Sequence, residues 1–152
     1  ILQTANRYST KKSSFSRTPL MQLYLHIPFC HRICPYCSFY KHTPGDTDMK
    51  AFIEAIGKEA LYYQERFQTE KINTLYLGGG TPSMLSPTLL KLLFEKLHHA
   101  FDLDHLKELT FEANPATFNL EKAKLFKQLG ITRISLGIQS FDNAILNMNG
   151  QI

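Results

Sequence analysis

After residue 21, short runs in which apolar and polar residues alternate are each followed by a longer run in which apolar residues recur at helical intervals. In residues 23–27, three aliphatic side chains alternate with Tyr24 and His26, which predicts a strand. Apolar residues at roughly helical intervals then predict a helix over residues 48–67. The succession repeats, with further strands expected at 72–82, 108–115 and 132–141.

Capping residues mark the helices between these strands. Ser86 stands as an N-cap and Pro87 as a first-turn residue of the second helix. Gly130 is placed as the C-terminal stop of a third helix over residues 119–130, and a fourth helix is expected to follow the last strand. Successive strand–helix units with short connections predict a parallel sheet with right-handed crossovers.

The faces of the last two strands favour a barrel over an open doubly wound sheet. In both strands, apolar side chains alternate with small or polar ones, namely Thr110, Glu112, Asn114, Ser135, Gly137 and Gln139. A sheet covered by helices on both sides would more often show continuous apolar runs. The small or polar face fits a barrel interior near the C-terminal rim, where barrel active sites lie. The predicted fold class is α/β, a partial (β/α) TIM-like barrel of about four units.

Composition limits the possible classes of protein. The 152 residues are 43% hydrophobic, enough for one domain-sized core, and no apolar run approaches the roughly 20 residues of a membrane span. The formal charge of +4 comes entirely from residues 1–20, which hold four basic residues and no acid. The remaining chain balances to zero and has no basic stripe, which argues against nucleic acid as a partner.

Residues 1–20 differ in composition from the rest, so the chain divides into this segment and a domain over residues 21–152. The segment is basic and rich in Ser and Thr. It fits a disordered tail, an upstream extension of a reading frame that begins at Met21, or a mitochondrial transit segment. We therefore expect a cytoplasmic location, with a mitochondrial one as the alternative, and a domain that is truncated at residue 152.

The three cysteines all lie in the stretch "HIPFCHRICPYCSFY", at Cys30, Cys34 and Cys37. An odd number does not make a disulfide framework, and a closed zinc site needs four ligands. Three thiolates therefore indicate a metal centre that is one protein ligand short. The alternative is a zinc site completed by a nearby histidine, either His26, His31 or His42.

Four motifs in order carry a resemblance to a known family: "LYLHIPFCHRICPYCSF", "LYLGGGTPSML", "FEANPATF" and "RISLGIQSF". Together they resemble the coproporphyrinogen dehydrogenase-like branch of the radical S-adenosylmethionine (SAM) superfamily. Within it the chain is more similar to the HemW-type heme chaperones than to the oxygen-independent coproporphyrinogen III dehydrogenases. The resemblance runs from about Leu23 to the end and implies an N-terminal part of a radical-SAM barrel.

This resemblance implies the cofactors and their ligands. Cys30, Cys34 and Cys37 would bind three irons of a [4Fe-4S] cluster, and SAM would occupy the fourth iron. Electron transfer from the cluster to SAM then yields a 5′-deoxyadenosyl radical in this family. The positions that match SAM contacts of the family are Tyr24, Tyr36, Gly79, Gly80, Thr81, Glu112 and Gln139. The glycines also have a simpler interpretation, a tight turn after a strand.

Two departures from the family pattern bear on function. Phe39 stands where the dehydrogenase has a fourth cysteine, which favours the heme chaperone. Gln151 stands where the family has an arginine that contacts SAM, and the loss of this fixed positive charge is expected to weaken SAM binding. The expected function is a chaperone that binds heme and passes it to an acceptor protein, with an electron donor as a further partner. The alternatives are an oxygen-independent coproporphyrinogen III oxidase and a catalytically silent metal-binding module, and no catalytic residue is assigned.

Overall fold

The computed structural model describes residues 2–5, 21–69 and 71–150 of the chain, and its core is a five-stranded sheet in the order β1-β2-β3-β4-β5. The strands are β1 (Leu2–Ala5), β2 (Gln22–Ile27), β3 (Thr74–Gly79), β4 (Glu108–Ala113) and β5 (Arg133–Leu136). Strands β2 to β5 are parallel, each to the next, and β1 is antiparallel to β2. The helices are α1 (Met49–Phe67), α2 (Pro87–Ala100), α3 (Leu120–Gln128) and α4 (Asn143–Met148), and two 3₁₀ turns are η1 (Pro82–Met84) and η2 (Pro115–Thr117).

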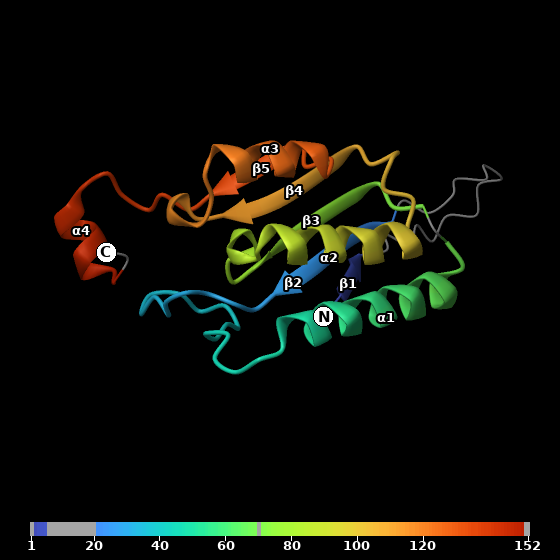
Figure 1. Cartoon of the computed structure of the whole chain (residues 1–152), viewed down its shortest axis with the longest axis horizontal. Coiled ribbons are helices and arrows are strands. Elements are labelled where there is room, and N and C mark those ends of the chain that lie inside the picture. The colour runs from blue at the N-terminus through green and yellow to red at the C-terminus, as the bar shows by residue number, and fades with distance from the viewer. Residues whose placement is uncertain (1, 6–20, 70, 151–152) are drawn as a thin grey trace, which may run out of the picture.

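The arrangement of layers settles the choice between the two sheet architectures. Helices α1, α2 and α3 all cover the same face of the sheet (Figure 1). A doubly wound sheet would place helices on both faces and reverse the strand order, whereas β2 to β5 follow one another without reversal. The sheet is therefore the partial barrel that the sequence predicts, with the helices outside and the uncovered face as the barrel interior.

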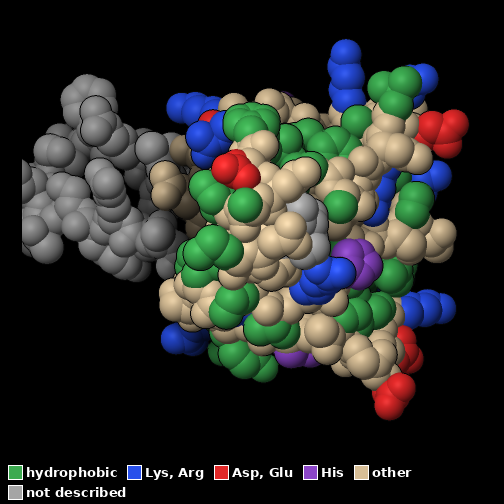
Figure 2. All heavy atoms as spheres, turned by 90° about the vertical axis from the view of Figure 1, so that its left-hand side faces the viewer, with side chains coloured by type: hydrophobic (Ala, Val, Ile, Leu, Met, Phe, Trp, Pro, Cys, Tyr) green, Lys and Arg blue, Asp and Glu red, His purple; other side chains and the backbone are tan. Residues whose placement is uncertain are grey.

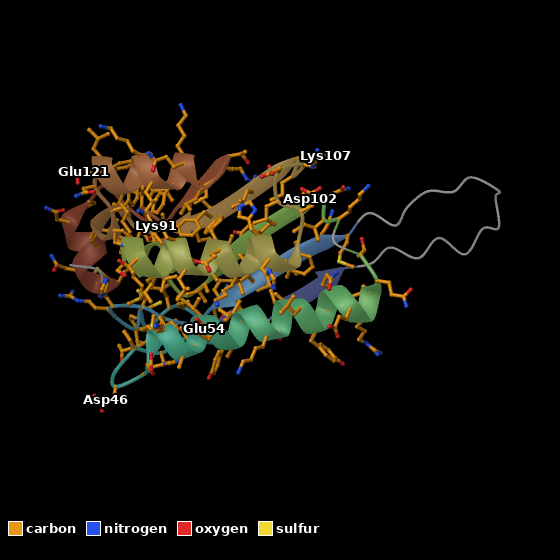
Figure 3. The ribbon with its side chains drawn as sticks, turned by 45° about the vertical axis from the view of Figure 1, so that its right-hand side comes forward. Asp46, Glu54, Lys91, Asp102, Lys107 and Glu121 are labelled. Atoms are coloured by element: carbon orange, nitrogen blue, oxygen red, sulfur yellow. The ribbon has the colours of Figure 1, made fainter. Side chains whose placement is uncertain are left out.

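Alternation along the strands separates the core from that interior face. The outer side chains of β2, β3 and β4 are almost fully buried under the helices; they are Leu23, Leu25, Ile27, Leu75, Leu77, Leu109, Phe111 and Ala113. Charged residues such as Glu54, Lys91 and Glu121 lie on the helices (Figure 3), and Glu54 pairs with Lys96 Nζ at 2.9 Å. In the described residues no helix is long and apolar enough to cross a bilayer.

The predicted helix boundaries are confirmed by their caps. Ser86 Oγ accepts a hydrogen bond from Leu89 N at 3.2 Å, and Pro87 is the first residue of α2. Gly130 has a positive φ of 81° just after α3, a conformation that glycine adopts without strain. Asp48 caps α1 by accepting from the main chain of Lys50 and Ala51.

Strand β5 differs from the prediction in length and in burial. The predicted strand continued to residue 141, but β5 ends at Leu136, because residues 136–140 fold into tight turns in which Gln139 has a φ of 66°. Its apolar face was expected to lie under a helix. Ile134 and Leu136 are instead 40% and 42% exposed, because α4 lies beyond the end of the sheet and does not cover β5 (Figure 1).

Residues 2–5 lie within the segment predicted as a disordered tail, an upstream extension or a transit segment, and they form strand β1. Residues 2–5 pair with β2, and Leu2 is 3% exposed within the hydrophobic core. The main-chain nitrogen of Leu2 also donates to Glu59 Oε1 on α1 at 3.1 Å. A short strand with a buried leucine offsets its own ordering cost, which a composition rich in Ser and Thr did not indicate. The rest of the predicted tail, residues 1 and 6–20, lies outside the described residues.

Candidate functional site

A cavity of about 430 Å³ opens at the carboxyl ends of the parallel strands. Its lining includes Cys30, Cys34, Tyr36, Cys37, Gly79, Gly80, Thr81, Glu112 and Gln139, which are all of the predicted site residues except Tyr24. In the view onto this end of the molecule, a Lys or Arg side chain and a His side chain lie together near the middle (Figure 2). The fold thus brings together residues that lie more than 100 positions apart in the sequence.

Cys30 is held firmly against the ends of the strands. Its main-chain nitrogen donates to His42 O at 3.0 Å, and its side chain is only 8% exposed. The hydroxyl of Thr81 donates to Cys30 Sγ at 3.5 Å, so the predicted SAM contact Thr81 also supports a predicted cluster ligand. Burial raises the pKa of the Cys30 thiol, and the Thr81 bond and the charge of Lys41 act in the opposite direction.

Cys34 and Cys37 lie on a separate turn at the mouth of the cavity. The main-chain nitrogen of Cys37 donates to Cys34 O at 3.2 Å, and both side chains are half-exposed. Lys41 Nζ donates to Cys37 O at 2.5 Å and to Phe39 O at 3.3 Å, which places a positive charge beside the turn. All three cysteines are free thiols that face one cavity, a donor set that suits a cluster of several irons.

Two of the three histidines proposed as zinc ligands, His26 and His42, have hydrogen bonds to main-chain carbonyl oxygens. His26 Nε2 lies 2.9 Å from Tyr40 O, and its Nδ1 lies 3.0 Å from Tyr24 Oη. Because a carbonyl oxygen can only accept, Nε2 carries the proton and Nδ1 accepts from the tyrosine. His42 Nδ1 is likewise 2.8 Å from Thr43 O. Within the described residues, no three His, Cys, Asp or Glu side chains form a group that could hold a single metal ion.

The glycines at the end of β3 and directly after it are required by the packing of the chain itself. A Cβ on Gly79, which has a φ of 108°, would lie 2.5 Å from the His26 ring. A Cβ on Gly80 would lie 2.6 Å from the main-chain oxygen of Phe29, and one on Gly78 would lie 2.8 Å from Glu112 Oε2. The run therefore lets β2, the cysteine segment and β4 approach one another closely. Its glycines are explained by this packing, whether or not a ligand is bound.

The main-chain N–H groups of this run already have acceptors. Gly79 N donates to Glu112 Oε2 at 3.0 Å, Gly80 N to Ile27 O at 2.8 Å and Thr81 N to Phe29 O at 2.7 Å. The groups of this glycine run that could bind a ligand in the cavity are therefore its carbonyl oxygens. Carbonyl oxygens accept hydrogen bonds from an ammonium group and do not bind an anion.

Glu112 joins the strands through a network on the interior face. Its Oε1 accepts from Tyr76 Oη at 2.6 Å, and its Oε2 holds Gly79. Burial together with the bond to the Glu112 carboxylate raises the pKa of Tyr76 to about 12. The ring of Tyr24 lies 5.8 Å from that of Tyr76, and burial followed by the Glu112 charge raises the pKa of Tyr24. Tyr24 thus lies behind the cavity wall and supports His26.

Sequence reasoning missed Tyr76 and the supporting role of His26. The sequence does indicate the position of Tyr76, because alternation in residues 74–79 places it on the opposite face of the strand from the buried Leu75 and Leu77. Applied to this strand, the alternation that identified Glu112 would have placed Tyr76 beside it on the interior face. Gln151, the predicted departure from a family arginine, lies outside the described residues.

The chain is similar in sequence and in fold to several known proteins. Residues 24–152 match the family described as the radical SAM superfamily. The chain is 41% identical over 128 residues to the heme chaperone HemW of Lactococcus lactis, covering 84% of this chain and 33% of that protein. It is 33% identical over 141 residues to HemW of Escherichia coli, covering 90% and 36%.

Two further matches widen the comparison. A mitochondrial protein of Bos taurus, radical S-adenosyl methionine domain-containing protein 1, is 33% identical, covering 85% of this chain and 29% of that protein. The solved structure of coproporphyrinogen III oxidase (HemN) from Escherichia coli superposes with a TM-score of 0.74 at 23% identity, covering 85% of this chain and 30% of that one. The chain therefore spans about a third of the length of the relatives that it matches.

Proposed function

The chain belongs to the radical SAM superfamily, and we propose that Cys30, Cys34 and Cys37 hold a [4Fe-4S] cluster with SAM on the open iron, in a protein that chaperones heme. One observation carries the cofactor part of this proposal. The three thiols, the glycine run and Glu112 come from segments far apart in the chain and line the same cavity. A zinc site is less well supported, because in the described residues no three His, Cys, Asp or Glu side chains form a group that could hold a single metal ion.

Different residues of the cavity would hold the cluster and SAM. When bound, the cluster supplies a single electron to the sulfonium of SAM. Thr81 and the main chain of His42 hold Cys30 in place, and Lys41 sets a positive charge beside the thiolate ligands. The carbonyl oxygens of residues 78–80 suit the amino group of SAM, because the N–H groups of Gly79 and Gly80 already have acceptors. Glu112 fixes this run from behind.

The role in heme delivery rests on the relatives. The two bacterial relatives are named heme chaperones, and the chain shares 41% and 33% identity with them. We infer that heme, or a related porphyrinogen, and a heme-acceptor protein are partners, and that an electron donor reduces the cluster. The similarity to a mitochondrial protein supports a mitochondrial location as the alternative to the cytoplasm. A coproporphyrinogen III oxidase is the second candidate, favoured by the fold similarity and disfavoured by Phe39 at the fourth-cysteine position.

Anaerobic reconstitution tests the cofactor part. We expect roughly four irons per chain in the wild type, and loss of that iron in Cys30→Ser, Cys34→Ser and Cys37→Ser. Ser38→Ala is the matched control, because Ser38 lines the same cavity without offering a thiolate. Equal iron content in the cysteine variants, or zinc in place of iron, would overturn the assignment.

Heme titration tests the chaperone part. Saturable heme binding followed by an absorbance change on transfer to an apo-hemoprotein is the expected result. Conversion of coproporphyrinogen III into a vinyl product would instead establish the oxidase. If a reconstituted chain shows neither activity, the silent metal-binding module is what remains.

A further inference from the structure

Residues 34–37, Cys-Pro-Tyr-Cys, form a turn whose ends are placed for a disulfide. The Cys37 N–H donates to Cys34 O at 3.2 Å, the bond that closes a four-residue β-turn. Such turns bring the first and last Cα atoms within about 7 Å, and disulfides span Cα separations of about 4.4–6.8 Å. Pro35 in the second position of the turn pre-sets the backbone for this conformation.

The third cysteine is held in a different way. Cys30 is 8% exposed, its main chain is bonded to His42, and its sulfur accepts from Thr81 at the end of β3. Cys34 and Cys37 are half-exposed and belong to the turn. An oxidant in solution therefore reaches the two turn cysteines more readily than the anchored one.

We propose that Cys34 and Cys37 form an intramolecular disulfide whenever the protein is free of its cluster, and that Cys30 remains a thiol. The pair is then a reversible modification site for small disulfides of the glutathione class. We further expect the disulfide to block cluster assembly, because it removes two of the three iron ligands. This further step rests on the proposed function, whereas formation of the disulfide does not.

The chemistry balances with glutathione disulfide as the oxidant. The thiolate of one turn cysteine attacks a sulfur of glutathione disulfide, forms a mixed disulfide and releases one glutathione thiolate. The thiolate of the other turn cysteine then attacks the protein sulfur of the mixed disulfide and releases the second glutathione. The two protein thiols lose two electrons and two protons in total, and the oxidant gains both as two molecules of glutathione.

Tryptic mapping of the full chain tests the proposal cleanly. Cleavage after Arg17, Arg32 and Lys41 puts Cys30 in peptide 18–32 and both turn cysteines in peptide 33–41. The cluster-free chain is equilibrated in glutathione buffers of rising disulfide fraction, quenched with acid, alkylated and digested. We expect peptide 33–41 to lose two hydrogens and both alkyl labels, while peptide 18–32 keeps its label. Reduction with dithiothreitol should restore both labels.

Variants separate this pairing from other outcomes. Cys30→Ser should leave the loss of two hydrogens in peptide 33–41 unchanged. Cys34→Ser should abolish it and leave a glutathione adduct on Cys37. A cross-link between peptides 18–32 and 33–41, or full labelling of peptide 33–41 under oxidising conditions, would overturn the proposal.

A second readout distinguishes failure of this inference from failure of the proposed function. Oxidised and reduced samples are each offered iron and sulfide without thiol reductant, and bound iron is counted together with the disulfide that remains in peptide 33–41, because sulfide itself can cleave disulfides. Iron uptake only by chains that have lost the disulfide is the expected result. Iron uptake by chains that keep the disulfide would contradict the block. If the disulfide forms but the reduced chain still binds no iron, the proposed cluster site is refuted. The disulfide is then established independently of the proposed function.

Discussion

The two sides of the cavity are built in opposite ways. The strand-end platform is made of Tyr24, His26, Tyr76, Gly79 and Glu112. Hydrogen bonds join its members on β3 and β4, another joins its two members on β2, and the rings of Tyr24 and Tyr76 lie beside each other. The cysteine turn, residues 34–37, is closed by the bond from Cys37 N to Cys34 O and accepts a bond from Lys41 Nζ at Cys37 O. Cys30 joins the two, because its main chain belongs to the cysteine segment and its sulfur accepts from Thr81 beside the platform.

This difference shows which part of the site is ready before any cofactor arrives. In the described residues, no buried side-chain nitrogen or oxygen lacks a hydrogen-bond partner. A fully satisfied polar network of this kind rigidifies the structure around it. The platform is therefore preformed, whereas the turn offers two half-buried free thiols to the cavity. We expect mutations in the platform to act on stability, and mutations in the turn to act on the cofactor and on redox state.

The largest effect on stability is expected from Gly79→Ala. The new Cβ would combine a φ of 108° with a 2.5 Å approach to the His26 ring, costing about 3 kcal/mol in the free energy of unfolding. Gly45→Ala is the control, because Gly45 also has a positive φ but nothing within 4 Å of its Cβ position. That variant should lose about 1 kcal/mol. Urea unfolding measures both, and equal losses would mean that the platform is not tightly packed.

The next effect is expected from Glu112→Gln. A glutamine side chain has one acceptor oxygen where the carboxylate has two, so it cannot accept from both Gly79 N–H and Tyr76 Oη, and we expect a loss of about 1–2 kcal/mol in unfolding free energy. Loss of the carboxylate should also lower the pKa of Tyr76 from about 12 toward its ordinary value of about 10. Difference titration of tyrosinate absorbance measures this shift. Glu121→Gln, on α3, is the control and should change neither quantity.

The sign of the pH dependence follows from the same bond. Folding raises the pKa of Tyr76, so the stabilisation from its neutral form is complete below about pH 10. It is lost as the pH rises from about 10 through about 12. Glu112→Gln should therefore flatten the decline of stability in that window, and an unchanged decline would contradict the network.

A smaller effect is expected from Tyr24→Phe. The substitution keeps the ring beside Tyr76 and removes the hydroxyl that donates to His26 Nδ1 at 3.0 Å. A hydrogen bond of this kind contributes about 1 kcal/mol, and urea unfolding should show a loss of that size. An unchanged midpoint would show that His26 is held by Tyr40 alone.

The smallest effect is expected beyond the platform, from Phe39→Ser. Phe39 is 64% exposed, so the free energy of unfolding should change by less than about 0.5 kcal/mol. A loss above about 1 kcal/mol in urea unfolding would contradict the contrast between platform and cysteine segment. Such a loss would mean that the aromatic ring is buried in solution.

Patterns that repeat along the chain made most of the fold predictable. Alternation identified β2 to β4, and it also placed Glu112 on the interior face where the structure has it. It could not place α4, because whether a helix covers Ile134 and Leu136 depends on tertiary contacts and not on local periodicity. Strand β1 was missed because a strand of four residues, Leu2–Ala5, is too short to show a clear period.

The candidate site was predicted as a set of residues but not as a set of bonds. Spacing and resemblance brought together the cysteines, Glu112 and Gln139 at one cavity. They did not reveal that Glu112 is bound to Tyr76, or that Thr81 supports the sulfur of Cys30. Such bonds depend on the register between strands, which pairs His26 with Gly78 and Tyr24 with Tyr76. Sequence alone does not fix register between strands separated by a helix.

The central claim is that three thiolates hold a cluster with one iron left open for SAM. Electron paramagnetic resonance of the anaerobically reconstituted, reduced chain, recorded with and without SAM, tests it most directly. We predict a cluster signal that changes when SAM is added and that is absent from Cys34→Ser. A signal that SAM leaves unchanged, or no cluster signal in a folded chain, would contradict the claim.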